Sequence, residues 1–280
     1  MRWMVTGARG MLGSDLVARL SRGENHVTAV DVDELDITDP AAVASITDVD
    51  VIVNCAAFTA VDAAEGDEGS AFTLNAVGPQ LLARAARRCG ARMVQISTDY
   101  VFAGDGSQPY EEDQLMAPLS AYGRTKAAGE WAVRAETDDH LIVRTAWLYG
   151  VAGNCFPKTI ARLAAGRDSL QVVDDQVGQP TWTADLADLI VRLIEADAPS
   201  GTYHGTSAGR VSWYGFTREI VGFLGKDPGM VSPTSSNAYQ SPAPRPSYSV
   251  LSHHALEEIG VAPIGDWRDR WHVAAPGVLS

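Results

Sequence analysis

The sequence predicts an α/β fold, namely a doubly wound parallel sheet with a smaller C-terminal part. Three observations predict it. Short apolar runs rich in β-branched residues alternate with amphipathic helical stretches through about the first 150 residues of the chain. A glycine-rich turn joins the first apolar run to the first helical stretch, and the alternation becomes irregular further on. Such alternation places helices on both faces of a parallel sheet and a ligand at the carboxyl ends of its strands.

The first element is an apolar strand at residues 2–6, and the turn Gly7-Ala-Arg-Gly10-Met-Leu-Gly13 follows it. Apolar side chains at helical spacing come next: Met11, Leu12, Leu16, Val17 and Leu20. Gly7 permits a tight turn, Gly10 lets the backbone approach a pyrophosphate, and Gly13 allows the helix to pack closely on the strand. The helix start adds free N–H groups. The spacing G-x-x-G-x-x-G differs from the commoner G-x-G-x-x-G, but this strand, turn and helix favour a dinucleotide site.

Later elements continue the alternation. The second strand, residues 26–30, ends at Asp31, near the expected distance for an acid that binds the adenosine ribose. Further strands are predicted at 50–56, 92–97 and 140–145, and helices at 41–47, at 71–89 and around Tyr122 and Lys126. The candidate functional residues lie just beyond the ends of predicted strands: Gly7, Asp31, the turn 56–59, Thr98 and Trp147. They therefore share the edge of the sheet where such folds bind ligands.

The C-terminal part is less regular. Helices are predicted at 154–165, 183–195 and 212–224, and strands at 171–173 and 202–204. Residues 228–246 are rich in Pro and Ser, which predicts a surface connection or a loop over the substrate. The sequence therefore predicts a Rossmann-type nucleotide-binding domain at 1–150. A substrate-binding part at 151–280 interleaves with it, because the helix near 183–195 returns to the first sheet.

Tyr122 and Lys126 lie four residues apart in Tyr122-Gly-Arg-Thr-Lys126, downstream of Ser97-Thr-Asp99. On a helix they share one face, so both can reach one substrate. An unperturbed tyrosine has a pKa of about 10, and a neighbouring ammonium lowers that pKa towards useful proton transfer. The pair suggests protonation of an alkoxide formed from a carbonyl.

Composition excludes several classes of protein. Net charge is −13, from 35 acids against 22 bases, which disfavours nucleic acid or an anionic membrane as partner. No apolar run approaches the roughly 20 residues of a membrane span, and Met1 leads straight into the first strand with no room for a signal peptide. Cys55, Cys89 and Cys155 predict buried, reduced thiols, and neither they nor the six His residues show a metal-ligand pattern. We expect a cytoplasmic enzyme.

Longer segments carry a family resemblance. Together with the glycine turn, Thr98 and Tyr122-x-x-x-Lys126, the chain resembles the extended short-chain dehydrogenase/reductases and, within them, the dTDP-4-dehydrorhamnose reductase family. The segments are Asn54-Cys-Ala-Ala-Phe-Thr-Ala-Val-Asp62, Gln95-Ile-Ser-Thr-Asp-Tyr-Val-Phe102, Arg144-Thr-Ala-Trp-Leu-Tyr-Gly150, Asp175-Gln-Val-Gly-Gln-Pro-Thr181 and Arg245-Pro-Ser-Tyr-Ser249. Two positions depart from the family, because Ser120 and Tyr248 stand where it usually has Asn. Both departures leave the exact sugar open.

The resemblance implies a reaction. Hydride from NADH or NADPH would reach the C4 ketone of a dTDP-4-keto-6-deoxy-hexose, most simply dTDP-4-dehydro-L-rhamnose or a related sugar of cell-wall or antibiotic biosynthesis. Tyr122 would protonate the oxyanion, Lys126 would hold the nicotinamide ribose and lower the Tyr122 pKa, and Thr98 would bind the carbonyl oxygen. The resemblance also implies a sugar pocket made by Val61, Asp62, Thr98, Asp99, Tyr100 and Trp147. Arg245 and Lys158 are candidates for the diphosphate. A homodimer is possible.

The predicted cofactor site takes in residues of several strand ends: Gly7, Arg9, Gly10, Met11, Leu12, Gly13, Asp31, Asp36, Ile37, Ala56, Ala57, Thr59, Ser97, Tyr122 and Lys126. Asp31 would bind a ribose 2′-hydroxyl and repel a 2′-phosphate, whereas Arg9 could neutralise that phosphate. The sequence therefore predicts NAD(P)H without a preference.

Two alternatives stay open. A nucleotide-sugar dehydratase or epimerase of the same fold shares Tyr122 and Lys126, but the dehydratases carry an Asp-Glu pair after the catalytic Thr, and here Asp99 is followed by Tyr100. A binding module that resembles the regulatory subunit of methionine adenosyltransferase is the other, although such a subunit has no chemical need for Thr98, Tyr122 and Lys126. Trp213, Tyr214 and Phe216, at helical spacing, are predicted to be core residues.

Overall fold

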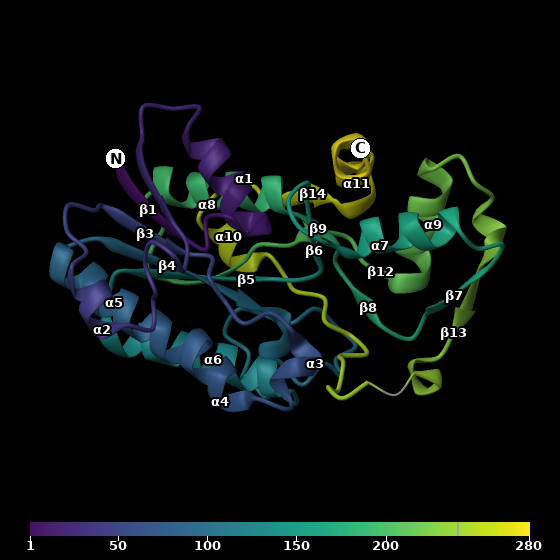
Figure 1. The fold of residues 1–280 in the computed structure, drawn as a ribbon, viewed down its shortest axis with the longest axis horizontal. Coiled ribbons are helices and arrows are strands. Elements are labelled where there is room, and N and C mark those ends of the chain that lie inside the picture. The colour runs from purple at the N-terminus through teal and green to yellow at the C-terminus, as the bar shows by residue number, and fades with distance from the viewer. Residues whose placement is uncertain (240) are drawn as a thin grey trace.

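The computed structural model describes residues 1–239 and 241–280, and within them six strands form one parallel sheet (Figure 1). The strand order is β10-β5-β4-β3-β1-β2. The strands are β1 (Arg2–Thr6), β2 (His26–Val30), β3 (Val51–Asn54), β4 (Arg92–Thr98), β5 (His140–Thr145) and β10 (Gly201–His204). From β1 the sheet grows to one side through β2 and to the other side through β3, β4, β5 and β10. This is the predicted doubly wound α/β sheet.

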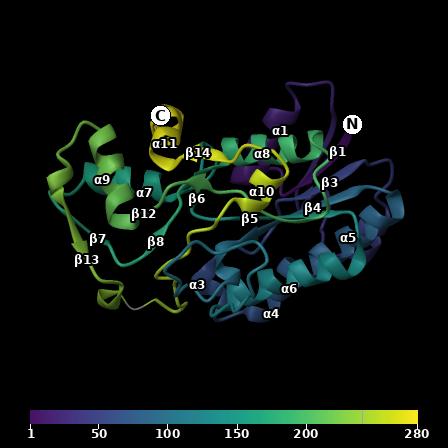
Figure 2. The same ribbon diagram turned by 180° about the vertical axis from the view of Figure 1, so that it is seen from behind.

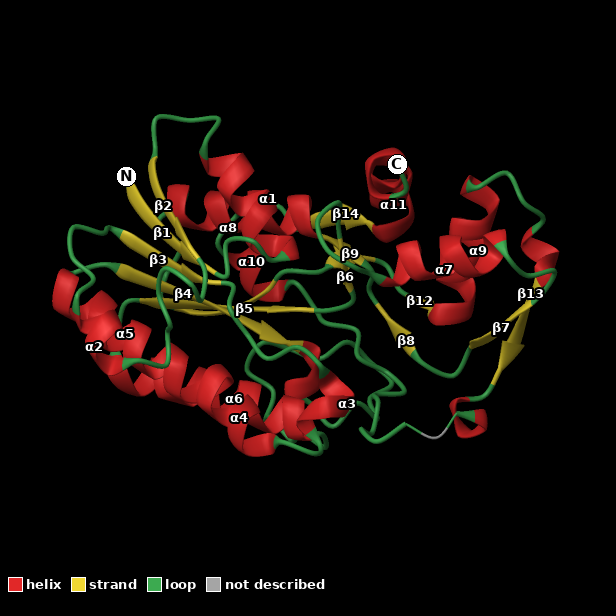
Figure 3. Ribbon diagram, in the orientation of Figure 1, coloured by secondary structure: helices red, strands yellow, loops and turns green. Residues whose placement is uncertain are grey.

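Helices cover both faces of the sheet (Figure 3). On one side lie α1 (Met11–Leu20), α8 (Thr183–Glu195) and α10 (His254–Glu258). On the other side lie α2 (Pro40–Ala44), α5 (Gly78–Cys89) and α6 (Ala121–Glu136), with α3 (Val61–Ala64) and α4 (Glu68–Phe72) beyond them. Alternate residues of each central strand therefore face opposite helical layers, which is why β3 reads as a continuous apolar run.

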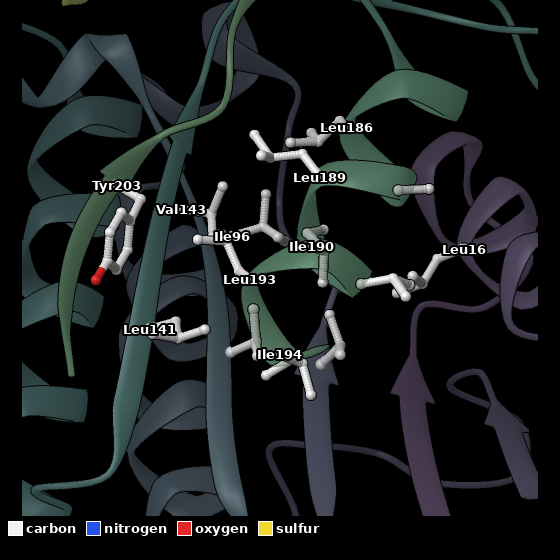
Figure 4. Packing of buried hydrophobic residues seen from close by; sticks show 14 of the residues in the cluster. Leu16, Ile96, Leu141, Val143, Leu186, Leu189, Ile190, Leu193, Ile194 and Tyr203 are labelled. Carbon is white, nitrogen blue, oxygen red and sulfur yellow. The ribbon is translucent and has the colours of Figure 1, made fainter. Parts of the chain in front are cut away.

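The larger core lies between the sheet and the α1 and α8 layer. Figure 4 shows Leu189 and Ile190 of α8 near Val143 of β5, with Leu16 of α1 further along the same cluster. Polar contacts fix the same two helices, because Arg19 pairs with Asp188 at 2.8 Å. The predicted helix at 183–195 thus packs on the N-terminal sheet, and the strand that follows it, β10, extends that sheet at β5. The division into parts at residue 150 stays a prediction.

A second group of elements lies at the other end of the molecule, as Figure 2 shows from behind. Its helices are α7 (Phe156–Ala165), α9 (Trp213–Phe223) and α11 (Trp267–Val278), which pack around Phe216 and Trp271. Short strand pairs connect it: β6 (Leu148–Tyr149) with β9 (Thr181–Trp182), β7 (Leu170–Val173) with β13 (Val231–Thr234), β8 (Val177–Gly178) with β12 (Val211–Ser212), and β11 (Ser207–Ala208) with β14 (Ile264–Asp266).

Several element boundaries differ from the predictions. The predicted helix at 71–89 is three pieces, because a π-helical turn, Thr73–Val77, separates α4 from α5. The predicted connection at 228–246 contains β13, which pairs in parallel with β7, while residue 240 lies outside the described residues. Helix α11 was not predicted. Strand pairing and wide loops depend on contacts distant in sequence, which local periodicity does not report.

None of the helices in the described residues is both long and apolar enough to cross a membrane.

Candidate active site

A cavity of about 1000 Å³ opens along the carboxyl ends of the parallel strands. Residues just past five strands line it: Gly7 after β1, Asp31 after β2, Cys55 after β3, Asp99 after β4 and Ala146 after β5. Most of the predicted site residues line this cavity: Gly7, Arg9, Gly10, Met11, Leu12, Asp31, Asp36, Ile37, Ala56, Ala57, Thr59, Val61, Ser97, Thr98, Asp99, Tyr100, Tyr122, Lys126 and Trp147. Gly13, Asp62 and Arg245 lie outside the lining.

The glycine turn forms one end of the cavity. Gly7 has φ +65°, and a Cβ there would lie 2.6 Å from the backbone N of Ala56, so only glycine fits. Gly10 precedes α1, whose first turn has no side-chain cap in the described structure, which leaves its N–H groups available to an anion. A Cβ on Gly13 would collide with the carbonyl oxygen of Gly7. Gly13 therefore serves helix packing, and the turn fits a pyrophosphate.

Asp31 is held in place by backbone donors. Its carboxylate accepts hydrogen bonds from the N–H of Arg9 at 3.0 Å and of Val32 at 2.9 Å. Burial opposes its ionisation, but these donors and the nearby Arg9 outweigh burial, so the pKa of Asp31 is lowered. The carboxylate is therefore charged at neutral pH and keeps lone pairs for ribose hydroxyls.

Arg9 does not stand ready for a phosphate. Its guanidinium donates to Asp33 at 2.7 Å and to Glu34 at 3.0 Å, and it lies 3.9 Å from Asp31. The sequence suggested that Arg9 neutralises a 2′-phosphate, whereas here three carboxylates already surround that one positive charge. A bound phosphate would have to displace one of them.

Thr98, Tyr122 and Lys126 meet at the middle of the cavity. Thr98 ends β4, and Tyr122 and Lys126 lie one turn apart on α6. Ser120, one of the two departures from the family, caps this helix by accepting a hydrogen bond from the N–H of Gly123 at 3.1 Å. The side chain of Lys126 is buried and donates to the carbonyl oxygen of Ile96 at 2.6 Å. The cap and this bond fix both reactive side chains against the end of β4.

The pKa of Tyr122 differs from the prediction. Burial raises the pKa of the Tyr122 phenol, a hydrogen bond with Thr98 opposes this, and the nearby Asp99 adds to it. Burial also lowers the pKa of Lys126 to about 8, although the negative charge of Glu130 partly raises it again. A lowered Tyr122 pKa was predicted, whereas the structure gives a raised one, because desolvation is the largest influence on the phenol and Lys126 is not among the groups that shift it. A raised pKa keeps the phenol protonated, as a proton donor requires.

A buried ion network lies beneath these residues. Glu130, one turn beyond Lys126, accepts the hydroxyl of Ser97 at 2.6 Å and two bonds from Arg144 of β5 at 2.9 and 2.8 Å. Arg134 adds a third guanidinium contact at 3.1 Å. Burial opposes ionisation of Glu130, but these partners keep its pKa lowered. The network ties α6 to β4 and β5, and it was not predicted because its members are far apart in sequence.

The π-helical turn also positions the site. It carries the buried Asn75, whose amide oxygen accepts the N–H of Phe58 at 2.8 Å and whose amide nitrogen donates to the carbonyl oxygen of Phe58 at 3.1 Å. The same nitrogen donates to Thr125 of α6 at 3.0 Å. Asn75 therefore holds the turn 56–59, which lines the cavity, against the helix that carries Tyr122 and Lys126.

The predicted substrate residues separate into two groups. Val61, Asp99, Tyr100 and Trp147 line the cavity with Thr98. Burial raises the pKa of Asp99 to about 6, and one of its carboxylate oxygens has no hydrogen-bond partner among the described residues. The ring of Tyr100 packs edge-on against that of Tyr122, with 5.7 Å between centroids. Asp99 is thus a buried acid next to Thr98, whose hydroxyl donates to its other carboxylate oxygen at 2.9 Å.

Asp62 and Arg245 instead pair with each other at the rim. Arg245 donates to the two carboxylate oxygens of Asp62 at 3.1 and 2.8 Å. Lys158 donates to the carbonyl oxygens of Val151 and Gly153 at 2.5 and 2.9 Å. Neither cation lines the cavity, so the structure does not place Arg245 or Lys158 on a diphosphate.

Trp213 has a second role that sequence reasoning missed, because it packs against the C-terminal core and also reaches the cavity. It was predicted to be core, but it lines the cavity and stacks on Trp147, with 3.4 Å between ring centroids. Phe216, one turn later, is a core residue as predicted. Other lining residues that were missed are apolar or small: Val32, Leu35, Asn54, Cys55, Leu74, Ile96, Thr145, Ala146, Leu148, Gly153 and Asn154. Their adjacency to marked strand ends was the available signal.

The described residues contain no cluster of three or more His, Cys, Asp or Glu side chains that could hold a metal ion. The thiols of Cys55, Cys89 and Cys155 form no disulfide within the described residues, and Cys155 is buried as predicted, whereas Cys55 and Cys89 are only half-buried.

Comparisons with known proteins identify the family of this chain. The family model described as the RmlD substrate binding domain matches residues 1–275. A probable dTDP-4,6-dihydroxy-2-methyloxan-3-one 4-ketoreductase of Streptomyces antibioticus is 48% identical over 286 residues, which cover 100% of this chain and 96% of the relative. A dTDP-4-dehydrorhamnose reductase of Streptomyces griseus is 48% identical over 275 residues, which cover 95% of this chain and 90% of the relative.

A solved structure is similar throughout. The dTDP-4-dehydrorhamnose reductase from Bacillus anthracis str. Ames, in complex with NADP, is 37% identical, has a TM-score of 0.94 and aligns over 98% of each chain. The family model and these relatives span nearly the whole sequence. This chain therefore belongs to the dTDP-4-dehydrorhamnose reductase family.

Proposed function

We propose that this protein reduces the C4 ketone of a dTDP-4-keto-6-deoxy-hexose with NAD(P)H. The observation that carries the proposal is the convergence of Thr98, Tyr122 and Lys126 on one cavity that begins at the glycine turn. Relatives named as reductases of such sugars, each 48% identical, support this chemistry. dTDP-4-dehydro-L-rhamnose is the first sugar to test, and the related ketosugar of the Streptomyces antibioticus relative is the second.

The residues of the cavity fit a dinucleotide. The turn at Gly7 and Gly10, with the uncapped start of α1, would hold the pyrophosphate, and Asp31 would bind the adenosine ribose. Lys126 would hold the nicotinamide ribose. When bound, the reduced nicotinamide supplies the hydride.

The remaining residues manage the proton. Thr98 would hydrogen-bond the ketone oxygen and place it beside Tyr122. Tyr122, kept protonated by its raised pKa, would donate its proton to the developing oxyanion, and the ammonium of Lys126 would stabilise the phenolate that remains. Asp99, Tyr100, Val61 and Trp147 would surround the sugar.

Two features favour a reductase over the alternatives. Tyr100 follows Asp99, and burial raises the pKa of its phenol, so it is no substitute for the carboxylic acid that elimination of water requires. The buried ammonium of Lys126, one helical turn from Tyr122 on α6, has a cost in desolvation that a pure binding subunit has no reason to bear. The homodimer stays a prediction.

The test is stoichiometry of cofactor oxidation. Incubation with dTDP-4-keto-6-deoxy sugars of the gluco and L-lyxo configurations, each with NADH and with NADPH, should show one NAD(P)H lost per sugar reduced. A dehydratase or epimerase returns the hydride to its substrate and would show no net loss. Tight association with another protein, without oxidation of NAD(P)H by any sugar, would instead favour the binding module.

Removing the Asp31 carboxylate should shift cofactor preference. We expect Asp31→Ala and Asp31→Asn to raise the ratio of kcat/KM for NADPH to that for NADH by about tenfold or more, since close like charges near a protein surface repel by about 1 to 4 kcal/mol. The ratio is measured on both variants and on Asp138→Ala, an exposed acid of the loop after α6. An unchanged ratio would show that another residue reads the ribose.

Cofactor affinity should depend on the charge of Lys126. A lysine is charged below its pKa, and burial has lowered this pKa from 10.5 to about 8, so the ammonium is present at neutral pH and is lost as the pH rises past that value. We therefore expect NAD(P)H binding, followed by fluorescence titration, to weaken between about pH 7 and pH 9.5. Lys126→Ala should bind weakly at every pH. Equal wild-type affinity over the range would contradict this role.

A further inference from the structure

Trp147 has a backbone conformation that bulky residues rarely adopt. Its φ is +48°, in the left-handed region, and it lies between β5 and β6 at the cavity wall. Such a conformation persists only where surrounding contacts hold it, and it often marks a ligand site. The residues that hold Trp147 therefore bear on how the site works.

Two residues from the C-terminal half enclose the indole of Trp147. The ring of Trp213 is stacked on it, with 3.4 Å between centroids and 6° between planes. On Gly178, an added Cβ would lie 2.6 Å from the ring, so the backbone of β8 touches it directly. These two contacts hold the Trp147 ring against the C-terminal half of the chain.

Backbone pairing brings these two contacts together. In the antiparallel pair of β8 and β12, Gly178 lies opposite Val211, and Trp213 begins α9 directly after β12. The side chain of Ser212 caps α9 by accepting the N–H of Gly215 at 3.1 Å. The pairing of β8 with β12 therefore fixes the positions of Gly178 and Trp213, the two residues that contact the Trp147 ring.

Trp213 is itself anchored in the C-terminal core. Its ring packs against Phe156 of α7 at 4.3 Å, and Phe156 lies 6.0 Å from the buried Phe216. Trp213 lines the cavity as well, so it forms a rigid link between the core of the second part and the cavity wall. A residue that served packing alone would have no reason to contact a strained cavity residue.

We propose that Trp213 is a positioning residue that holds Trp147 in its cavity-facing orientation and thereby sets affinity for the nucleotide sugar. The inference rests on the proposed function, which puts the sugar beside Trp147. Indoles pack well on the C–H faces of a pyranose and on the C6 methyl group of a 6-deoxy sugar. Trp213 acts through Trp147, so it governs sugar binding and leaves the proton transfer at Tyr122 and the cofactor site untouched.

The test compares Trp213→Leu, which keeps apolar volume but loses the stack, with Trp213→Phe, which keeps an aromatic ring. Trp213→Leu should raise KM for the sugar about tenfold or more, because it removes the aromatic stack that supports Trp147 at the cavity wall. The value of kcat should stay within about threefold of the wild type, and NAD(P)H affinity should be unchanged. Trp213→Phe should recover most of that KM. Tyr214→Leu, the next residue on α9 and outside the cavity, is the matched control and should leave KM unchanged.

A spectroscopic readout separates positioning from general damage. Two indoles stacked this closely couple electronically, so the wild type should show an exciton couplet in far-ultraviolet circular dichroism that both Trp213 variants and Trp147→Phe lose. If the couplet disappears in Trp213→Leu while the sugar KM stays at the wild-type value, the inference is wrong. If Trp213→Leu does not fold, Gly178→Ala takes its place, because the added Cβ would push on the Trp147 ring. That variant must then raise the sugar KM, and an unchanged KM there overturns the inference. Failure of the wild type to reduce any sugar would count against the proposed function instead.

Discussion

Tyr122→Phe will lower turnover by a factor of about 100 or more and leave NAD(P)H affinity nearly unchanged. The substitution removes only the hydroxyl that would donate the proton. The ring, its edge-on contact with Tyr100 and the ammonium of Lys126 all stay in place. Because the phenol is held protonated by burial, the wild-type group is ready to donate at neutral pH.

The measurement is kcat and cofactor Kd for Tyr122→Phe beside Tyr149→Phe. Tyr149 is a suitable control because its hydroxyl is buried, lies outside the cavity lining and has no hydrogen-bond partner among the described residues. Tyr149→Phe should keep the wild-type rate. A Tyr122→Phe enzyme that retained more than about half of the wild-type rate would remove Tyr122 from the mechanism, since a positioned acid contributes a factor of 100 or more.

Glu130→Ala will lower the free energy of unfolding by about 3 to 5 kcal/mol. Glu130 is fully buried, and the side chain of Arg144, which it binds through two hydrogen bonds, is only 2% exposed. Loss of the carboxylate leaves that guanidinium charged, desolvated and without its partner, and it also frees Ser97 and Arg134. An uncompensated buried charge costs far more than the net value of the pair itself.

Glu68→Ala provides the comparison for urea unfolding. Glu68 also accepts two hydrogen bonds from one arginine, Arg124, at 2.8 and 2.7 Å, but both side chains are more than two-fifths exposed. Exposed pairs contribute about 1 kcal/mol or less, so this variant should be close to the wild type. Equal losses of unfolding free energy in the two variants would mean that burial does not determine how much the Glu130 network contributes to stability.

The sequence predicted the parts of the fold that depend on local patterns. Apolar runs at β1, β3 and β4 and the amphipathic spacing of α1 follow from burial on one or two faces, and the carboxyl ends of parallel strands must share an edge. For that reason Gly7, Asp31, Thr98 and Trp147, distant in sequence, were expected at one site, and all line the same cavity.

What the sequence did not reveal depends on partners distant in the chain. Trp213 has helical spacing with Phe216, which fits a core residue, and only the β8 and β12 pairing turns it towards Trp147. The acids around Arg9 and the burial that raises the Tyr122 pKa are likewise products of the fold. A charge's partners and its desolvation cannot be inferred from its position in a sequence.

The central claim is that hydride passes to the C4 carbon of a dTDP-4-keto-6-deoxy sugar while Tyr122 supplies the proton. The most direct test uses NAD(P)H deuterated at the transferable position, with nuclear magnetic resonance of the isolated product. We predict one deuterium at C4 of the reduced sugar, bound to carbon and not exchanged with water, and almost none in the product of Tyr122→Phe over the same time. Deuterium that stays in the cofactor, or a product label at C5 or C6, would contradict the assignment as a C4 ketoreductase.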